Sequence, residues 1–150
     1  MALDELYSDK ILHIAGNAIQ PGRLAQPDAS ARKVSRLCGS VIEVDIAAVD
    51  GVIVGYGHEI SACALGQASA AIVAREIVGT SVSDFDTLSL TMLNMLKSDG
   101  APPAGKWSDL AYLEPVRDFP ARHASTMLVF DAINQALGKI MQKQDIAAAG

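Results

Sequence analysis

Three things are scarce in this sequence, and each shortage narrows what the protein can be. Basic residues are outnumbered, with 12 Lys and Arg against 17 Asp and Glu, which argues against a nucleic-acid binder because phosphate recognition needs a basic surface. Long apolar runs are the second shortage, since none approaches the roughly 20 residues that span a bilayer. The N-terminus also lacks the basic segment and apolar stretch of a secretory signal. Proteins, metals and small molecules are therefore the expected partners, with no nucleic acid and no membrane.

Cysteine is the third shortage, because Cys38 and Cys63 are the only two thiols. They form no Cys-x-x-Cys motif, which argues against a dedicated dithiol redox enzyme. With no export signal we expect a cytoplasmic, reducing setting, where two cysteines serve metal or redox chemistry more often than a structural disulfide. The alternative for each thiol is simple packing, since free cysteine is among the most buried residue types.

The sequence predicts one helix and one irregular segment within residues 3–35. Half of the 150 residues are hydrophobic, which is enough for one compact core, so residues 1–150 are expected to form a single domain. Apolar residues at helical spacing predict a short helix over residues 3–14, stopped by Gly16 and Asn17. Residues 17–35 carry Pro and Gly without periodicity, which predicts an irregular segment that crosses the surface.

A β-hairpin is the strongest local prediction. Residues 41–49 and 52–60 are rich in β-branched side chains, and Asp50-Gly51 between them suits a two-residue turn in which both positions need positive φ. Residues near Val34 are expected to add a third strand. Because a hairpin brings its outer ends side by side, Cys38 before the first strand and Cys63 after the second are expected to be neighbours.

Helices are predicted for the rest of the chain. Ser61 is expected to cap a helix that ends near Gly79, which puts Cys63 in its first turn. There the helix macrodipole favours the negative charge of a nucleophilic or metal-binding thiolate.

The next helix is expected to open with an approximate capping box at Ser83 and Asp86 and to run to about residue 97. The ambiguous segment that follows is expected to lay Trp107 and Tyr112 over the core.

The last helix is expected to begin at Pro120, which is acceptable at a first helical position, and its tail from about Gln144 is expected to fray. His123 lies one turn before the apolar stripe of this helix and shares its face, so it can point inward near the start of the helix. The alternative for His123 is a hydrogen-bonded core histidine. The stripe consists of Met127, Phe130, Ile133, Leu137 and Ile140.

Three short motifs stand in order along the chain. Leu37-Cys38-Gly39-Ser40 contains the first thiol, residues 62–70 contain Cys63, and residues 116–122 read Val-Arg-Asp-Phe-Pro-Ala-Arg. In this order they resemble the Cys-Gly-Asp motif and the second cysteine motif of the IscU/NifU-type iron–sulfur cluster assembly scaffolds, and the Val-Arg-x-Phe-Pro-x-Arg segment of the SufU branch of that family. The resemblance covers about residues 3–137.

This resemblance implies an α+β fold, a small antiparallel three-stranded sheet with helices packed on it. It also implies a 2Fe-2S cluster, iron or zinc bound by three cysteines with an aspartate or histidine. Sulfur would come from a cysteine desulfurase, and the cluster would go to iron–sulfur acceptor proteins. Such a protein is a scaffold and not an enzyme.

The sequence departs from the family pattern at two ligands. Ser40 stands in place of the motif aspartate, and alignment puts the third cysteine at Ser125 or Ala124. The metal or cluster is then predicted to be held by Cys38, Cys63 and, as a replacement third ligand, His123.

Three functions stay open. The first is a scaffold-like protein that binds iron, a 2Fe-2S cluster or zinc and passes it on. The second is a cluster-free adaptor or regulator that binds a cysteine desulfurase, which the two lost ligands motivate. The third is a redox protein whose thiols cycle between dithiol and disulfide. The incomplete ligand set also allows a homodimer that bridges a cluster.

Overall fold

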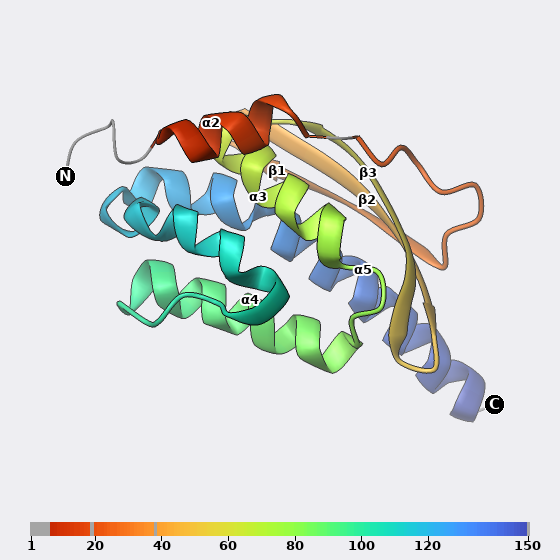
Figure 1. Cartoon of the computed structure of the whole chain (residues 1–150). Helices are drawn as coiled ribbons and strands as arrows, with labels where there is room; N and C mark the ends of the chain where they lie inside the picture. Colours follow the sequence, from red (N-terminus) through yellow and green to blue (C-terminus); the bar gives the residue numbers. More distant parts are fainter. Residues whose placement is uncertain (1–6, 19, 38, 150) are drawn as a thin grey trace.

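The computed structural model describes residues 7–18, 20–37 and 39–149, the last five of them as backbone. Three strands form one antiparallel sheet in the order β1-β2-β3, and helices pack on it (Figure 1). The predicted α+β fold is therefore confirmed. The elements are α2 (Asp9–Gly16), β1 (Ala29–Ser35), β2 (Ser40–Val49), β3 (Val52–Ser61), α3 (Ala64–Glu76), α4 (Val82–Lys97), the 3-10 helices η1 (Gly105–Asp118) and η2 (Pro120–Arg122), and α5 (His123–Ala149).

The β2–β3 hairpin forms where the turn chemistry predicts it. Asp50 and Gly51 have φ of 51° and 78°, both positive as the tight two-residue turn requires. The third strand expected near Val34 is also present, but β1 begins at Ala29 and so takes the last 7 residues of the segment expected to be irregular. Its sequence, Ala-Ser-Ala-Arg-Lys-Val-Ser, has low strand propensity, so pairing with β2 decides its conformation.

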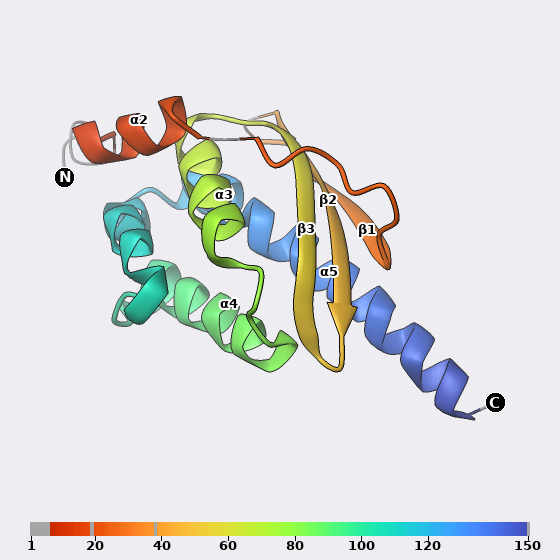
Figure 2. The same ribbon diagram turned by 45° about the vertical axis from the view of Figure 1, so that its right-hand side comes forward.

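One face of the sheet is buried under α5. Ile42, Val44 and Ile46 alternate along β2 and are fully buried, because successive side chains of a strand point to opposite faces. Figure 2 shows α5 running along this side of the sheet, in contact with β1 and β2. All five apolar residues predicted for the stripe of this helix are buried.

The opposite face is crossed by the chain between α2 and β1. Arg23 in this segment donates to the Asp45 carboxylate over 2.6 and 2.8 Å, and Ser30 donates to it over 2.6 Å. The Arg23 hydrogen bond lowers the pKa of the buried Asp45 to about 2. Gly57 pairs with Asp45, and a Cβ at Gly57 would overlap the carbonyl oxygen of Gly22, so only glycine lets the segment lie here.

Within the described residues, the first helix is α2 from Asp9, and Tyr7 and Ser8 of the predicted helix precede it. Ser8 caps α2 by accepting a 3.3 Å hydrogen bond from the Ile11 amide. The predicted stop is confirmed, because α2 ends at Gly16 and Asn17 follows as its C-cap. The first part of the predicted helix, in residues 1–6, lies outside the described residues.

Helix α4 also begins with a different cap from the one predicted. Ser81 accepts a 3.0 Å hydrogen bond from the Asp84 amide, so the predicted capping box at Ser83 and Asp86 is wrong, although the helix ends at Lys97 as expected.

In η1, Trp107 is buried as predicted, whereas the prediction for Tyr112 is wrong because 43% of this residue is exposed.

Among the described helices, none is both long and apolar enough to cross a membrane.

Candidate functional site

Cys63 lies where strand β3 gives way to helix α3. It is the N-cap residue of α3, with extended backbone at φ −66° and ψ 171°. The prediction that Ser61 caps this helix is wrong, because Ser61 is the last residue of β3 and pairs with Val41. The Cys63 side chain makes no capping hydrogen bond, so its sulfur is available to another group.

That group is the hydroxyl of Ser125. Cys63 Sγ lies 3.1 Å from Ser125 Oγ, and either atom can donate the hydrogen bond. Ser125 is 1% exposed in the first turn of α5, whereas the thiol is half-buried. The N-termini of α3 and α5 therefore meet at this sulfur and hydroxyl, and the positive ends of both helix dipoles favour negative charge there.

Gly66 makes the close approach of the two helices possible. A Cβ at this position would lie 2.9 Å from Ala62 Cβ and 3.1 Å from Ser125 Oγ, tighter than side chains tolerate without moving. The absence of a side chain at Gly66 therefore lets the first turn of α5 pack against α3 and keeps Ser125 beside the thiol.

Cys38 lies outside the described residues, so its predicted contact with Cys63 is untested. The backbone on both sides of it is described. β1 ends at Ser35 and β2 begins at Ser40, and these two residues pair across the turn between the strands. Because Val41 pairs with Ser61, this turn and the start of α3 lie at the same end of the sheet.

His123 opens α5 two residues before Ser125. Its Nε2 lies 3.0 Å from the carbonyl oxygen of Val116 and 3.2 Å from that of Arg117. Since carbonyl oxygens only accept, Nε2 carries the proton and the ring is anchored to the end of η1. The described part of the chain holds no group of three His, Cys, Asp or Glu side chains placed around one metal ion.

Comparison with known proteins decides the family. No established family model matches the chain. A crystal structure of a nitrogen-fixing NifU-like protein (N-terminal) from Brucella abortus is 44% identical to this chain. The match covers 94% of this chain and 98% of that one, with a TM-score of 0.91. The chain belongs to the IscU/NifU-type family.

More distant relatives agree with this membership. The iron–sulfur cluster assembly scaffold protein IscU of Thermotoga maritima is 25% identical over 140 residues, which cover 93% of this chain and 98% of that protein. A putative scaffold protein for the SUF system from Fervidobacterium islandicum is 18% identical with a TM-score of 0.81 over 91% of this chain and 99% of that one, and this likeness concerns the fold alone.

Ser125 is one of the positions at which this IscU/NifU-type chain departs from the family pattern, and the structure shows its surroundings. It is buried against Cys63, whereas Ala124 is exposed, so the geometry favours Ser125 over Ala124 as the equivalent of the third cysteine. Ser40, at the aspartate position, is 1% exposed at the start of β2. A serine hydroxyl is a weaker ligand for iron or zinc than thiolate or carboxylate.

A buried contact between Tyr56 and His58 was not predicted from the sequence. Tyr56 Oη lies 2.7 Å from His58 Nδ1 on β3, and burial lowers the pKa of His58 to about 4. A single histidine in a strand of mixed character gives no signal of this contact, which depends on the strands and helices that cover it.

Proposed function

We propose that this protein is a scaffold-like carrier in iron–sulfur cluster assembly. In this proposal it binds iron or a 2Fe-2S cluster, or zinc in the same place, through the thiolates of Cys38 and Cys63, and transfers the load to acceptor proteins. The observation that carries the proposal is the half-buried Cys63 thiol at the junction of two helix N-termini, at the sheet end where the β1–β2 turn also lies. The scaffold relatives extend over nearly the whole chain and support it.

Two cysteine thiolates suit a metal ion or cluster that the protein holds only briefly. Thiolates are the preferred ligands of iron in clusters and suit zinc equally well, and two of them bind less firmly than three or four. Such a protein would receive sulfur from a cysteine desulfurase, and its weak hold on the product would favour release. It performs no bond-making of its own and is not an enzyme in this account.

The third protein ligand is proposed to be His123 or to be missing. Nε2 of His123 is occupied by the carbonyl oxygens of η1, so the Nδ1 lone pair is the one that a metal would use. Ser125 Oγ lies 3.1 Å from Cys63 Sγ, but a hydroxyl is a weak ligand. Metal affinity that falls in His123→Ala and not in Ser125→Ala would assign the ligand to histidine.

The adaptor alternative has its own observation. Ser125, one of the two positions that alignment gives for the third cysteine, is a buried hydroxyl in contact with Cys63, and a hydroxyl is a poor ligand for iron or zinc. In this alternative the protein binds a cysteine desulfurase and carries no cluster.

One experiment separates the two functions. The purified chain is incubated under anaerobic conditions with iron, cysteine and a cysteine desulfurase, and then mixed with an apo 2Fe-2S acceptor protein. We expect iron and sulfide to move to the acceptor, and transfer to fail in Cys38→Ser and Cys63→Ser but not in the control Ser83→Ala. A wild-type chain that binds the desulfurase yet carries no iron or sulfide would overturn the scaffold proposal in favour of the adaptor.

A further inference from the structure

The hydroxyl of Ser125 has one hydrogen-bond partner in the part of the chain that the structure describes, the sulfur of Cys63 at 3.1 Å. The neighbouring residue behaves differently, since Thr126 donates to the Arg122 carbonyl one turn back over 3.1 Å, as serine and threonine commonly do in helices. Within the described residues, Ser125 makes no such bond to its own helix. Because Ser125 is only 1% exposed, the sulfur is the group that satisfies this buried hydroxyl.

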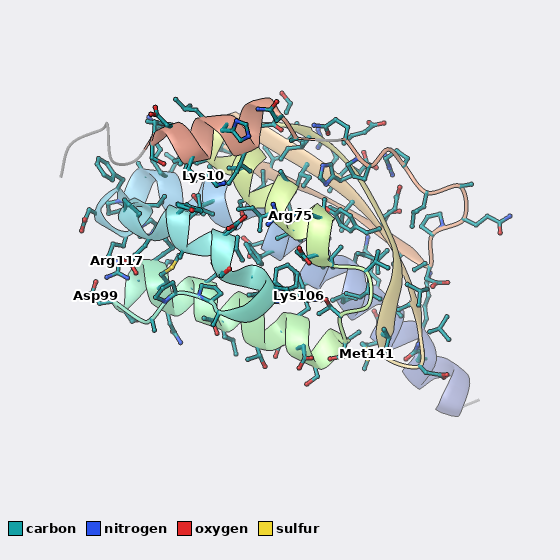
Figure 3. The ribbon with its side chains drawn as sticks, in the orientation of Figure 1. Lys10, Arg75, Asp99, Lys106, Arg117 and Met141 are labelled. Atoms are coloured by element: carbon teal, nitrogen blue, oxygen red, sulfur yellow. The ribbon has the colours of Figure 1, made fainter. Side chains whose placement is uncertain are left out.

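The first turn of α5, which carries Ser125, is held from two sides. On one side, Ser69 of α3 donates to a carbonyl of this turn over 2.9 Å. On the other side, the ring of His123 is anchored to the carbonyl of Arg117. The Arg117 side chain in turn pairs with Asp99 over 3.5 Å, and Figure 3 labels both residues. The fold therefore fixes the turn that directs the Ser125 hydroxyl at the sulfur.

The direction of this hydrogen bond depends on the state of the sulfur. In the thiol either atom can donate, but a thiolate, whether free or bound to a metal ion, can only accept. A Cys63 that acts as a ligand therefore leaves Ser125 as the donor, and the bond becomes charge-assisted. The Cys63 side chain makes no capping hydrogen bond with α3, so among the described residues Ser125 is the one protein donor to this sulfur.

We propose that Ser125 is a positioning residue of the metal site, which donates a hydrogen bond to the metal-bound Cys63 thiolate and is not itself a ligand. The bond fixes the direction of the sulfur and draws negative charge from it, so the sulfur gives less charge to the metal. Alignment gives this position as one of two for a third thiolate, and a neutral hydroxyl here leaves the site with one negative charge fewer. The inference rests on the proposed function, because it concerns Cys63 as a metal ligand.

The test loads the purified chain with cobalt(II) under anaerobic conditions, because the cobalt spectrum separates a ligand from a hydrogen-bond donor. The energy of the sulfur-to-cobalt charge-transfer band reports how firmly the thiolate holds its electrons, and the intensity of the ligand-field bands reports the number of ligands. We expect Ser125→Ala to move the charge-transfer band to longer wavelength by several nanometres, because a hydrogen bond to an ionised group is lost. The ligand-field intensity should stay unchanged. The control Ser69→Ala removes another buried hydroxyl from the same interface and should change neither band.

Three outcomes would overturn the proposal, and each has a separate meaning. A charge-transfer band that stays in place in Ser125→Ala would show that the hydroxyl does not donate to the bound sulfur, while the metal function stands. A change of ligand-field intensity in Ser125→Ala would make Ser125 a ligand. A wild-type chain without a charge-transfer band would overturn the proposed metal function together with this inference.

Discussion

Replacing Ser125 with cysteine is predicted to turn a two-thiol site into a three-thiol site. Ser125 Oγ lies 3.1 Å from Cys63 Sγ. Two sulfurs bound to one tetrahedral zinc ion, each at about 2.3 Å, are about 3.8 Å apart. The new sulfur therefore has to lie only about 0.7 Å farther from Cys63 Sγ than the hydroxyl does, and a small torsional adjustment of the side chain supplies this difference.

The expected gain follows from the strength of zinc–ligand bonds. Complete four-ligand zinc sites bind with about 10–16 kcal/mol, or roughly 3 kcal/mol for each ligand, and about 1.4 kcal/mol is a factor of ten in affinity. Ser125→Cys should therefore hold zinc about a hundredfold more tightly than the wild-type chain. Competition with a chromophoric chelator under anaerobic conditions at pH 7 measures the difference.

Ser69→Cys is the matched control for this substitution. Ser69 is buried in the same α3–α5 interface, but its hydroxyl donates to the Thr126 carbonyl and not to Cys63, so a thiol there should leave zinc affinity unchanged. The reasoning is refuted if zinc affinity is also unchanged in Ser125→Cys while mild oxidation of the metal-free variant links residues 63 and 125 in a disulfide. That result would show two adjacent thiols that do not share an ion.

Two further predictions concern the buried polar groups and the close packing of the sheet. Burial lowers the pKa of His58 from 6.5 to about 4, so the unfolded chain takes up a proton that the folded chain refuses as the pH falls through this range. The free energy of unfolding should therefore be fully retained above pH 6.5 and fall by about 3 kcal/mol on going to pH 4. Urea unfolding should show this slope in His13→Asn but not in His58→Asn, and an equal slope in both would contradict the assignment. Gly57→Ala should lower the free energy of unfolding by about 2–3 kcal/mol, because its Cβ would overlap the Gly22 carbonyl oxygen, whereas Gly55→Ala meets only side-chain atoms at 3.3 Å or more. Equal stability of the two alanine variants would contradict the packing described for the sheet.

The parts of the fold that could be predicted from the sequence are those that neighbouring residues determine. Asp50-Gly51 specifies its turn through positive φ at both residues, and the two flanking runs then have one register. Capping was less predictable. Ser61 has the side chain of a cap, but pairing with Val41 extends β3 through it, so Cys63 becomes the N-cap instead. Tertiary pairing thus outweighs a side-chain preference worth about 1 kcal/mol.

Contacts between distant segments could not be predicted in the same way. Arg23 and Asp45 are 22 residues apart, and their pairing depends on Gly57 having no side chain, which no local pattern encodes. Alignment to the family gave Ser125, or Ala124 when aligned on the histidine, as the place of the missing third cysteine, but nothing in the sequence predicted the contact of Ser125 with Cys63. The burial of Ser125 is what favours one of the two.

The most direct test of the metal-binding account is the iron and acid-labile sulfide content of the anaerobically reconstituted protein, measured with its visible absorption spectrum. The account predicts iron, sulfide and a cluster spectrum in the wild-type chain, all lost in Cys63→Ser and Cys38→Ser and retained in Ser83→Ala. A colourless wild-type protein without iron or sulfide, or a cluster that survives in both cysteine variants, would contradict it.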